Sequence, residues 1–202
     1  MYEMRRGRAV GSLLVALILP GLAGCAGDIH TATTDQITQA AFWQELAAHC
    51  GSSYAGRATL APAGDTVVEG RNLVMHVMEC AENEIRIPFH VDDNRSRTWV
   101  ITRSDSSLAL AHDHRHEDGT PESDSGYGGE TVVPGTTRSQ AFPADRPAGE
   151  LEHPDGTNVW TMEFERDDRF VYSFHRTGTD RRYRIEFDLT ETVATPPPPW
   201  GR

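Results

Sequence analysis

The residues Arg182-Tyr183-Arg184-Ile185-Glu186-Phe187-Asp188-Leu189 alternate between polar and apolar side chains without a break. Successive side chains of a β-strand point to opposite faces of a sheet, so a period of two is the pattern of a strand with one face in a core. Arg169–Arg176 shows the same pattern and precedes this stretch by a short turn, Gly178-Thr179-Asp180. Together the two segments predict an antiparallel hairpin.

The same periodicity recurs through most of the chain, and short turn signals separate the segments. The expected strands are Tyr54–Leu60, Asn72–Cys80, Glu84–Val91, Thr98–Arg103, Leu108–His116, Arg138–Phe142, Asn158–Arg166, Arg169–Arg176 and Arg182–Leu189. Hairpin-length connections favour an all-β antiparallel meander, and closure into a barrel of about 8–10 strands removes the two exposed edges.

Two segments of the domain depart from this pattern. Residues 37–49 carry apolar side chains at helical spacing, and Cys50-Gly51 follows them, which predicts a short helix before the first strand. Residues 118–137 are rich in glycine and proline, and we expect one long irregular loop there, either a functional lid or a disordered segment.

The N-terminus has the layout of an export signal. Three arginines precede the apolar run Ala9–Leu19, and Leu22-Ala23-Gly24-Cys25 follows a Pro-Gly break. The run is shorter than the about 20 apolar residues that a transmembrane helix needs. The segment resembles bacterial lipoprotein signals, which implies that Cys25 is lipidated and becomes the first mature residue. By the same resemblance, Ala26 in place of Asp implies anchoring in the outer membrane, facing the periplasm.

This resemblance sets the expected domain boundaries. Residues 1–24 are the signal peptide, 25–36 a lipidated tether, 37–190 a single barrel domain and 191–202 a proline-rich tail. The tail contains four consecutive prolines and is expected to be an extended, frayed terminus. The expected partner of the tether is the lipid bilayer of the cell envelope, through acylated Cys25.

The charge of the chain argues against one class of partner. Its formal net charge is −11. Removal of the signal peptide takes away three arginines and one glutamate and leaves about −13. Such a protein gains nothing from counterion release on a phosphate backbone, so no nucleic acid partner is expected.

Three cysteines remain to be assigned, and export accounts for them. Lipidation of Cys25 leaves Cys50 and Cys80 as a pair in an oxidising compartment, where disulfides persist. We therefore predict a Cys50–Cys80 disulfide.

Histidines cluster at one place, His112-Asp113-His114-Arg115-His116. On a strand, His112, His114 and His116 share a face at intervals of about 6.6 Å, so two neighbours could bind one divalent metal ion, such as zinc. A tetrahedral site would also need a ligand from another strand, for example His76, His90 or His175. The alternatives are a polar barrel interior that contacts a ligand, or a solvated surface.

A ligand-binding set is predicted from the same region and from the strand Glu84–Val91. Arg86 and His90 share one face of that strand, so Arg86 would contact an anion if the face looked into the barrel and would be ordinary surface if it looked outward. The predicted ligand-binding residues are Arg86, His90, Arg97, His112, His114 and Tyr127.

The layout of helix, then Tyr54-Ala55-Gly56, then antiparallel hairpins resembles lipocalin and calycin-type barrels, although the Gly-x-Trp of true lipocalins is missing. Segments such as Glu84–Val91, Ser96–Val100 and His112–Gly119 are similar to those of uncharacterised bacterial secreted proteins. This resemblance implies a barrel without naming an activity, and similarity to zinc-binding periplasmic calycins keeps metal binding open.

Three functions are compatible with these features. The first is a non-enzymatic, membrane-anchored barrel that binds a small molecule, which is the role we expect because no common catalytic motif is present. The second is a metal-binding protein or metalloenzyme that uses the strand of His112 and His114. The third is a structural envelope protein whose barrel is filled by side chains.

Overall fold

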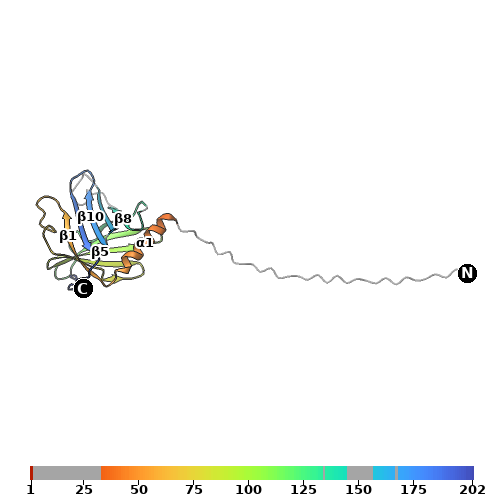
Figure 1. The fold of residues 1–202 in the computed structure, drawn as a ribbon, viewed down its shortest axis with the longest axis horizontal. Helices are drawn as coiled ribbons and strands as arrows, with labels where there is room; N and C mark the ends of the chain where they lie inside the picture. The colour runs from red at the N-terminus through yellow and green to blue at the C-terminus, as the bar shows by residue number, and fades with distance from the viewer. Residues whose placement is uncertain (2–32, 134, 145–156, 167) are drawn as a thin grey trace. The chain divides into compact units, whose positions relative to one another are not determined.

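The fold is a nearly closed antiparallel β-barrel with one short helix, in a computed structural model (Figure 1). The structure describes residues 1, 33–133, 135–144, 157–166 and 168–202. The Leu22-Ala23-Gly24-Cys25 segment and most of the expected tether lie outside these residues. Residues Ala32–Arg202 form one compact unit.

The elements follow one another as expected for a meander. They are α1 (Thr34–Ala48), β1 (Ser53–Leu60), β2 (Leu73–His76), β3 (Glu79–Cys80), β4 (Glu84–Val91), β5 (Asn94–Arg103), β6 (Leu108–His114), β7 (Tyr127–Glu130), β8 (Ser139–Pro143), β9 (Asn158–Glu165), β10 (Arg169–Arg176) and β11 (Arg182–Asp188). The order across the sheet is β7-β6-β5-β4-β2-β1-β11-β10-β9-β8, and β3 pairs with β4 beside this path. The all-β class and the barrel are therefore confirmed.

The seam between β7 and β8 nearly closes the barrel. The two strands meet through a single bridge between Gly129 and Ala144. A Cβ atom on Gly129 would lie 2.0 Å from the carbonyl oxygen of Pro143, so no other residue allows this approach. β7 falls within the segment expected to be an irregular loop, and that part of the expectation is wrong. Its Tyr-Gly-Gly-Glu sequence does not alternate between apolar and polar residues. Its two glycines instead allow the backbones of the neighbouring strands to come close.

Pro88 lies in a central strand, where proline is rare. The carbonyl group of Arg86 accepts a hydrogen bond from the backbone N–H of Met78. Backbone groups two residues apart point to the same side, so the backbone nitrogen of Pro88 also faces β2. The paired residues of β2 and β4 end at Met75 and Phe89, so the missing N–H of Pro88 lies one position beyond this ladder.

The helix α1 covers one end of the barrel. Thr33 and Gln36 form a capping box that begins the helix. Phe42 is fully buried and its ring lies 5.6 Å from that of Phe164 at the end of β9. The amide of Gln39 donates to the hydroxyl of Thr131 in the connection after β7. α1 thus closes the end where β5–β6, β7–β8 and β9–β10 turn, and residues 34–36 of the expected tether belong to it.

The proline-rich tail packs against the barrel, so the expectation of a frayed terminus is wrong. The backbone N–H of Val193 donates to the carbonyl of Ser53, and that of Trp200 donates to the carbonyl of Arg95. Pro199 is buried. Consecutive prolines have little backbone entropy to lose when they pack, which lowers the cost of ordering this segment. Figure 1 shows the C-terminus beside the barrel.

The predicted disulfide between Cys50 and Cys80 is present and joins the end of α1 to β3. Its sequence separation is 30 residues. It therefore ties the helix that closes the barrel to the sheet that it closes.

Replacing both cysteines by serine should lower the free energy of unfolding by about 3 to 4 kcal/mol, because the unfolded chain regains the entropy of an open loop. Urea denaturation of the two proteins measures the difference. Reductant should bring the wild-type protein to the stability of the variant and leave the variant unchanged. Equal stability of the oxidised wild type and the variant would contradict the prediction.

Candidate functional site

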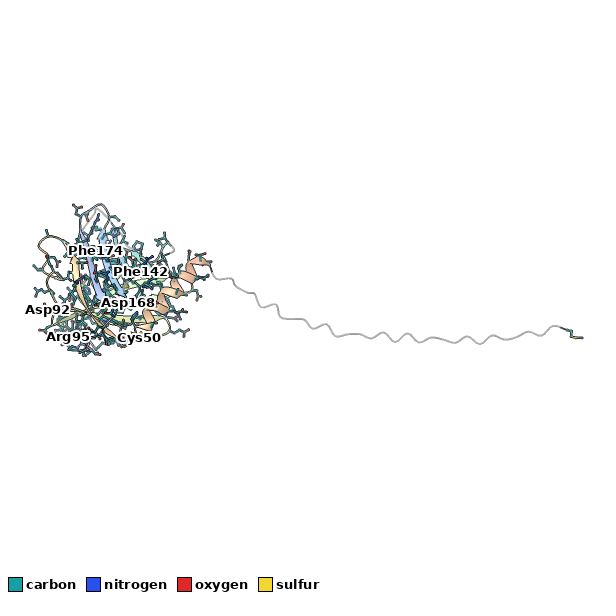
Figure 2. All side chains as sticks on the ribbon, in the orientation of Figure 1. Cys50, Asp92, Arg95, Phe142, Asp168 and Phe174 are labelled. Atoms are coloured by element: carbon teal, nitrogen blue, oxygen red, sulfur yellow. A yellow bond between two sulfur atoms is a disulfide. The ribbon has the colours of Figure 1, made fainter. Side chains whose placement is uncertain are left out.

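A cavity of about 390 Å³ opens at the barrel end opposite α1. Val67 and Val68 from the β1–β2 connection, Asp124 from the β6–β7 connection and Arg181 from the β10–β11 turn lie at its rim. In a meander these connections share one end, and α1 covers the other. Figure 2 shows Phe174, which lines the cavity, and Cys50, at the end of α1, well apart in the domain.

Two kinds of side chain line this cavity. The aromatic ones are Phe89, Trp99, Tyr127, Trp160, Tyr172, Phe174 and Tyr183. The charged or titratable ones are Arg97, His112, His114, Asp124, Arg176 and Arg181. The cavity is therefore a mainly aromatic chamber with polar groups at defined positions, which is the usual composition of a small-molecule site.

The aromatic rings stack across the interior. Trp99 of β5 lies 4.9 Å from Phe89 at an interplanar angle of 10° and 4.4 Å from Tyr172 at 24°. Trp160 of β9 lies 6.0 Å from Phe174 of β10. These rings come from inward-facing positions of four strands, which is the alternation that the sequence pattern predicts. They form flat, apolar walls.

His112 is held by hydrogen bonds at both ring nitrogens. Nδ1 lies 3.2 Å from the carbonyl oxygen of Tyr127, and Nε2 lies 2.8 Å from the hydroxyl of Tyr172. A carbonyl can only accept, so Nδ1 carries the proton and Nε2 of the neutral ring accepts from Tyr172. The ring also stacks on Tyr127 at 4.5 Å. His112 is thus a fixed, fully partnered part of the cavity wall.

Burial keeps these groups uncharged. It lowers the pKa of His112 to about 3, while the hydrogen bond with the Tyr127 carbonyl opposes the change. Burial raises the pKa of Tyr127 to about 12; Asp124 raises it further, and Arg97 and Arg181 oppose the change. Burial also holds the pKa of Tyr172 well above its usual value. The deep part of the cavity therefore carries no charge at neutral pH.

His114 lies nearer the rim, beside two carboxylates from the following loop. One ligand atom each of His114, Glu122 and Asp124 lies within 4.8 Å of the others. Nδ1 of His114 is 3.9 Å from a carboxylate oxygen of Glu122, and Nε2 is 3.4 Å from the hydroxyl of Tyr127. Burial, and then Arg97, lower the pKa of His114, so its ring is neutral and able to bind a metal ion.

The structure brings together four of the six predicted ligand-binding residues. Arg97, His112, His114 and Tyr127 line the cavity. Arg86 and His90 are not among its lining residues, because Ile85, Ile87 and Phe89 take the inward positions of β4. Arg86 instead pairs with Asp113 at 2.8 Å on the outer face, which was the alternative considered for it.

His90 lies on that same outer face and is 4% exposed. Its Nε2 has no hydrogen-bond partner among the described residues, and burial lowers its pKa to about 4, helped by Arg95 and His76. His90 is therefore a neutral, buried group outside the cavity.

Of the three histidines predicted as metal ligands, only His114 belongs to the group of described residues that could share an ion. The rings of His112 and His114 are 6.4 Å apart, and both nitrogens of His112 are occupied by protein partners. His116 follows the end of β6 and is exposed. Glu122 and Asp124 take the place of strand neighbours, since the chain turns back at residues 115–121.

Sequence reasoning missed Trp160, Tyr172, Arg176 and Arg181 as cavity residues. The two aromatic residues appeared as core positions of regular strands, and the strand pattern alone does not separate a filled interior from a hollow one. Arg176 and Arg181 lie at the end of β10 and in the turn after it, where charged residues are usually solvated. Their convergence depends on the closure of the barrel.

The fold and the cavity define the class: a small antiparallel β-barrel, closed at one end by a helix, whose interior is compatible with ligand binding. Comparisons with protein-family models, with curated proteins and with solved structures found no match to this chain. Among the described residues, no helix has the length and apolar character needed to span a membrane.

Stability should fall as the pH is lowered from 6.5 toward 4, because the unfolded chain protonates histidines that the fold keeps neutral. The pKa values of His112 and His90 lie near 3 and 4 in the fold, below the usual 6.5, so their contribution is complete above pH 6.5 and is lost on acidification. Each contributes a slope of up to about 1.4 kcal/mol per pH unit in this window. Urea denaturation at a series of pH values measures it.

The matched variants are His112→Gln and Tyr172→Phe. Both lose the hydrogen bond between these residues, but only the first removes the titrating ring. His112→Gln should flatten the slope, whereas Tyr172→Phe should lower stability at every pH and keep the slope. A wild-type slope in His112→Gln would contradict this role of burial.

Proposed function

We propose that this protein is a non-enzymatic barrel that binds a small molecule and is held at the bacterial cell envelope by a lipidated Cys25. The observation that carries the proposal is the aromatic cavity of about 390 Å³. Volumes of about 300 to 1,000 Å³ are usual for small-molecule sites. A barrel filled by its own side chains would leave no such space.

The arrangement of polar groups supports binding over a purely structural role. Within the cavity, the hydrogen bonds of His112 fix the wall without needing water or ligand. Aromatic faces such as Trp99 and Trp160 provide apolar contact, and large rings lose little conformational freedom when they bind. The walls are thus ordered before a ligand arrives, which lowers the entropic cost of binding.

The anchor part of the proposal rests on the sequence Leu22-Ala23-Gly24-Cys25, which lies outside the described residues. A single acyl chain binds a bilayer only marginally, so stable anchoring through Cys25 would require more than one acyl chain. The resemblance of this segment to lipoprotein signals supports a location of the domain at the outer membrane, facing the periplasm. A barrel tethered there would bind a ligand close to the membrane surface.

A neutral fluorescent probe, N-phenyl-naphthylamine, should bind the cavity and gain fluorescence. Val67 lines the rim of the cavity and is 43% exposed, so Val67→Trp places a large ring over the opening with little effect on the core. We expect this variant to weaken probe binding about tenfold or more, since steric exclusion removes most of the contact area. Fluorescence titration measures the affinity.

Val132→Trp is the matched control. Val132 is a 73% exposed valine outside the lining of the cavity, so the same substitution adds the same ring without covering the opening. Its affinity should equal that of the wild type. Failure of the probe to bind, or equal affinity in all three proteins, would contradict small-molecule binding in the cavity.

A second candidate function is binding of a divalent metal ion at the rim. His114, Glu122 and Asp124 offer one nitrogen and two carboxylate oxygens, a donor set that suits zinc. Nδ1 faces Glu122, so Nε2 would carry the proton and donate to the hydroxyl of Tyr127, a partner of the kind that orients metal-binding histidines. The donor atoms lie within 4.8 Å of one another and need to approach by up to about 1.5 Å to reach tetrahedral zinc geometry.

For this candidate, equilibrium dialysis should show one zinc ion bound per chain in the wild type. His114→Ala should abolish binding, and Glu122→Gln should weaken it at least about tenfold, because each removes a ligand. His116→Ala should bind like the wild type, since His116 is outside the group. Loss of zinc in His116→Ala but not in His114→Ala would contradict this set of ligands.

A further inference from the structure

Three arginines converge on the open end of the cavity. Arg97 comes from β5, Arg176 from the end of β10 and Arg181 from the turn that follows. Asp124 is the one carboxylate among the described residues that line the same cavity. The whole chain has a net charge of −11, so this entrance has the opposite sign from the protein as a whole.

These arginines differ from those on the outer surface of the barrel. Arg86, Arg115 and Arg184, for example, each lie within 3.1 Å of a carboxylate oxygen. Within the described part of the chain, no ion pair involves Arg97, Arg176 or Arg181.

The hydrogen bonds of the cavity arginines go to neutral acceptors instead. Nη1 of Arg97 donates to the side chains of Asn94 and Ser96, each at 3.2 Å. Nε of Arg176 donates to the side-chain oxygen of Asn158 at 2.8 Å. The guanidinium of Arg181 lies 5.7 Å from the centre of the Phe174 ring. Each guanidinium has five N–H donors, so most of them remain for another partner.

Of the three cavity arginines, Arg176 is the one that most favours an anionic partner. It is 7% exposed, and its partner Asn158 is also buried. Burial, and then the positive charge of Arg181, lower the pKa of Arg176. A buried charge paired only with a neutral amide is costly, and an anion that pairs with it recovers part of that cost.

The apolar walls lie directly inside this entrance. Trp99 and Tyr172 stack on one another at 4.4 Å, and Trp160 and Phe174 lie across the cavity from neighbouring strands. Such walls suit a flat hydrocarbon body. Guanidinium groups bind carboxylates through paired, parallel hydrogen bonds, and they bind more strongly where water is excluded.

We propose that the ligand of this barrel is an anion with a flat apolar body. Its carboxylate lies among Arg97, Arg176 and Arg181, and its body lies between the aromatic walls. This inference rests on the proposed function and specifies its ligand class. The polar end of the ligand faces the rim, and the apolar end points toward the uncharged interior around His112.

The test compares three probes with one body: naphthylacetate, naphthylethanol and naphthylethylamine. Isothermal titration calorimetry on the wild-type protein should give naphthylacetate an affinity at least about tenfold above that of the alcohol, the size expected for one charged hydrogen-bonded contact. The amine should bind most weakly. Added salt should lower the affinity for naphthylacetate and leave the affinity for naphthylethanol unchanged, because salt screens charges near a surface.

Three variants locate the contact. Arg97→Gln and Arg181→Gln should each lower the affinity for naphthylacetate about tenfold and leave the affinity for naphthylethanol unchanged. Arg182→Gln is the matched control, because it removes the same charge at the next residue, which is exposed and outside the cavity lining. This variant should bind all three probes like the wild type.

The outcomes separate the two proposals. Equal affinity for the acid and the alcohol, or preference for the amine, would overturn the anionic ligand and leave small-molecule binding intact. An equal loss of naphthylacetate affinity in Arg182→Gln and in the cavity variants would also overturn the anionic ligand. The net charge of the protein would then explain the preference for the acid over the alcohol. If N-phenyl-naphthylamine binds but no naphthyl probe does, the ligand class is wrong; if none of these compounds binds, the proposed function fails as well.

Discussion

The pairing of β1 with β11 is the constraint on which the barrel depends. It joins the first and last strands of the domain, with Gly56 opposite Phe187 and Ala58 opposite Ile185. A Cβ atom on Gly56 would lie 2.5 Å from the ring of Phe187, so only glycine leaves room for that ring. Phe187 is fully buried and lies 6.1 Å from both Phe89 and Trp99. The pairing of the first and last strands therefore also positions two of the rings that line the cavity, Phe89 and Trp99.

Closure by sequential hairpins gives the barrel two different ends. α1, the Cys50–Cys80 disulfide and the turns after β5, β7 and β9 gather at one end, where Phe42 and Leu46 fill the core. The connections after β1, β6 and β10 gather at the other and carry the polar groups of the rim. A meander always sorts its turns in this way, and here one helix decides which end is closed. The position of the site follows from the position of α1.

Side-chain alternation was enough to predict the barrel, but the site needed the closed structure. Arg169–Arg176 and Glu84–Val91 were predicted to the residue because one face of each is apolar. β7 was missed because two of its four residues are glycines, which allow close backbone contact but give no apolar alternation. The residues of the His112 strand were recognised from their chemistry, whereas Arg176 and Trp160 meet them only because β9 and β10 close against β6 through β7 and β8. That contact spans the whole topology and leaves no local pattern.

The cavity is uncharged in its interior and positively charged at its rim. Inside, both ring nitrogens of His112 are hydrogen-bonded, one to Tyr127 and one to Tyr172, so this polar group within the aromatic interior has no charge and no unsatisfied donor. At the rim, the donors of Arg176 exceed what Asn158 can accept. A group whose hydrogen bonds are all made resists exchange of partners, and a charged group with donors to spare favours it. Discrimination between ligands therefore belongs at the rim, while the interior contributes shape and apolar contact to any ligand that enters.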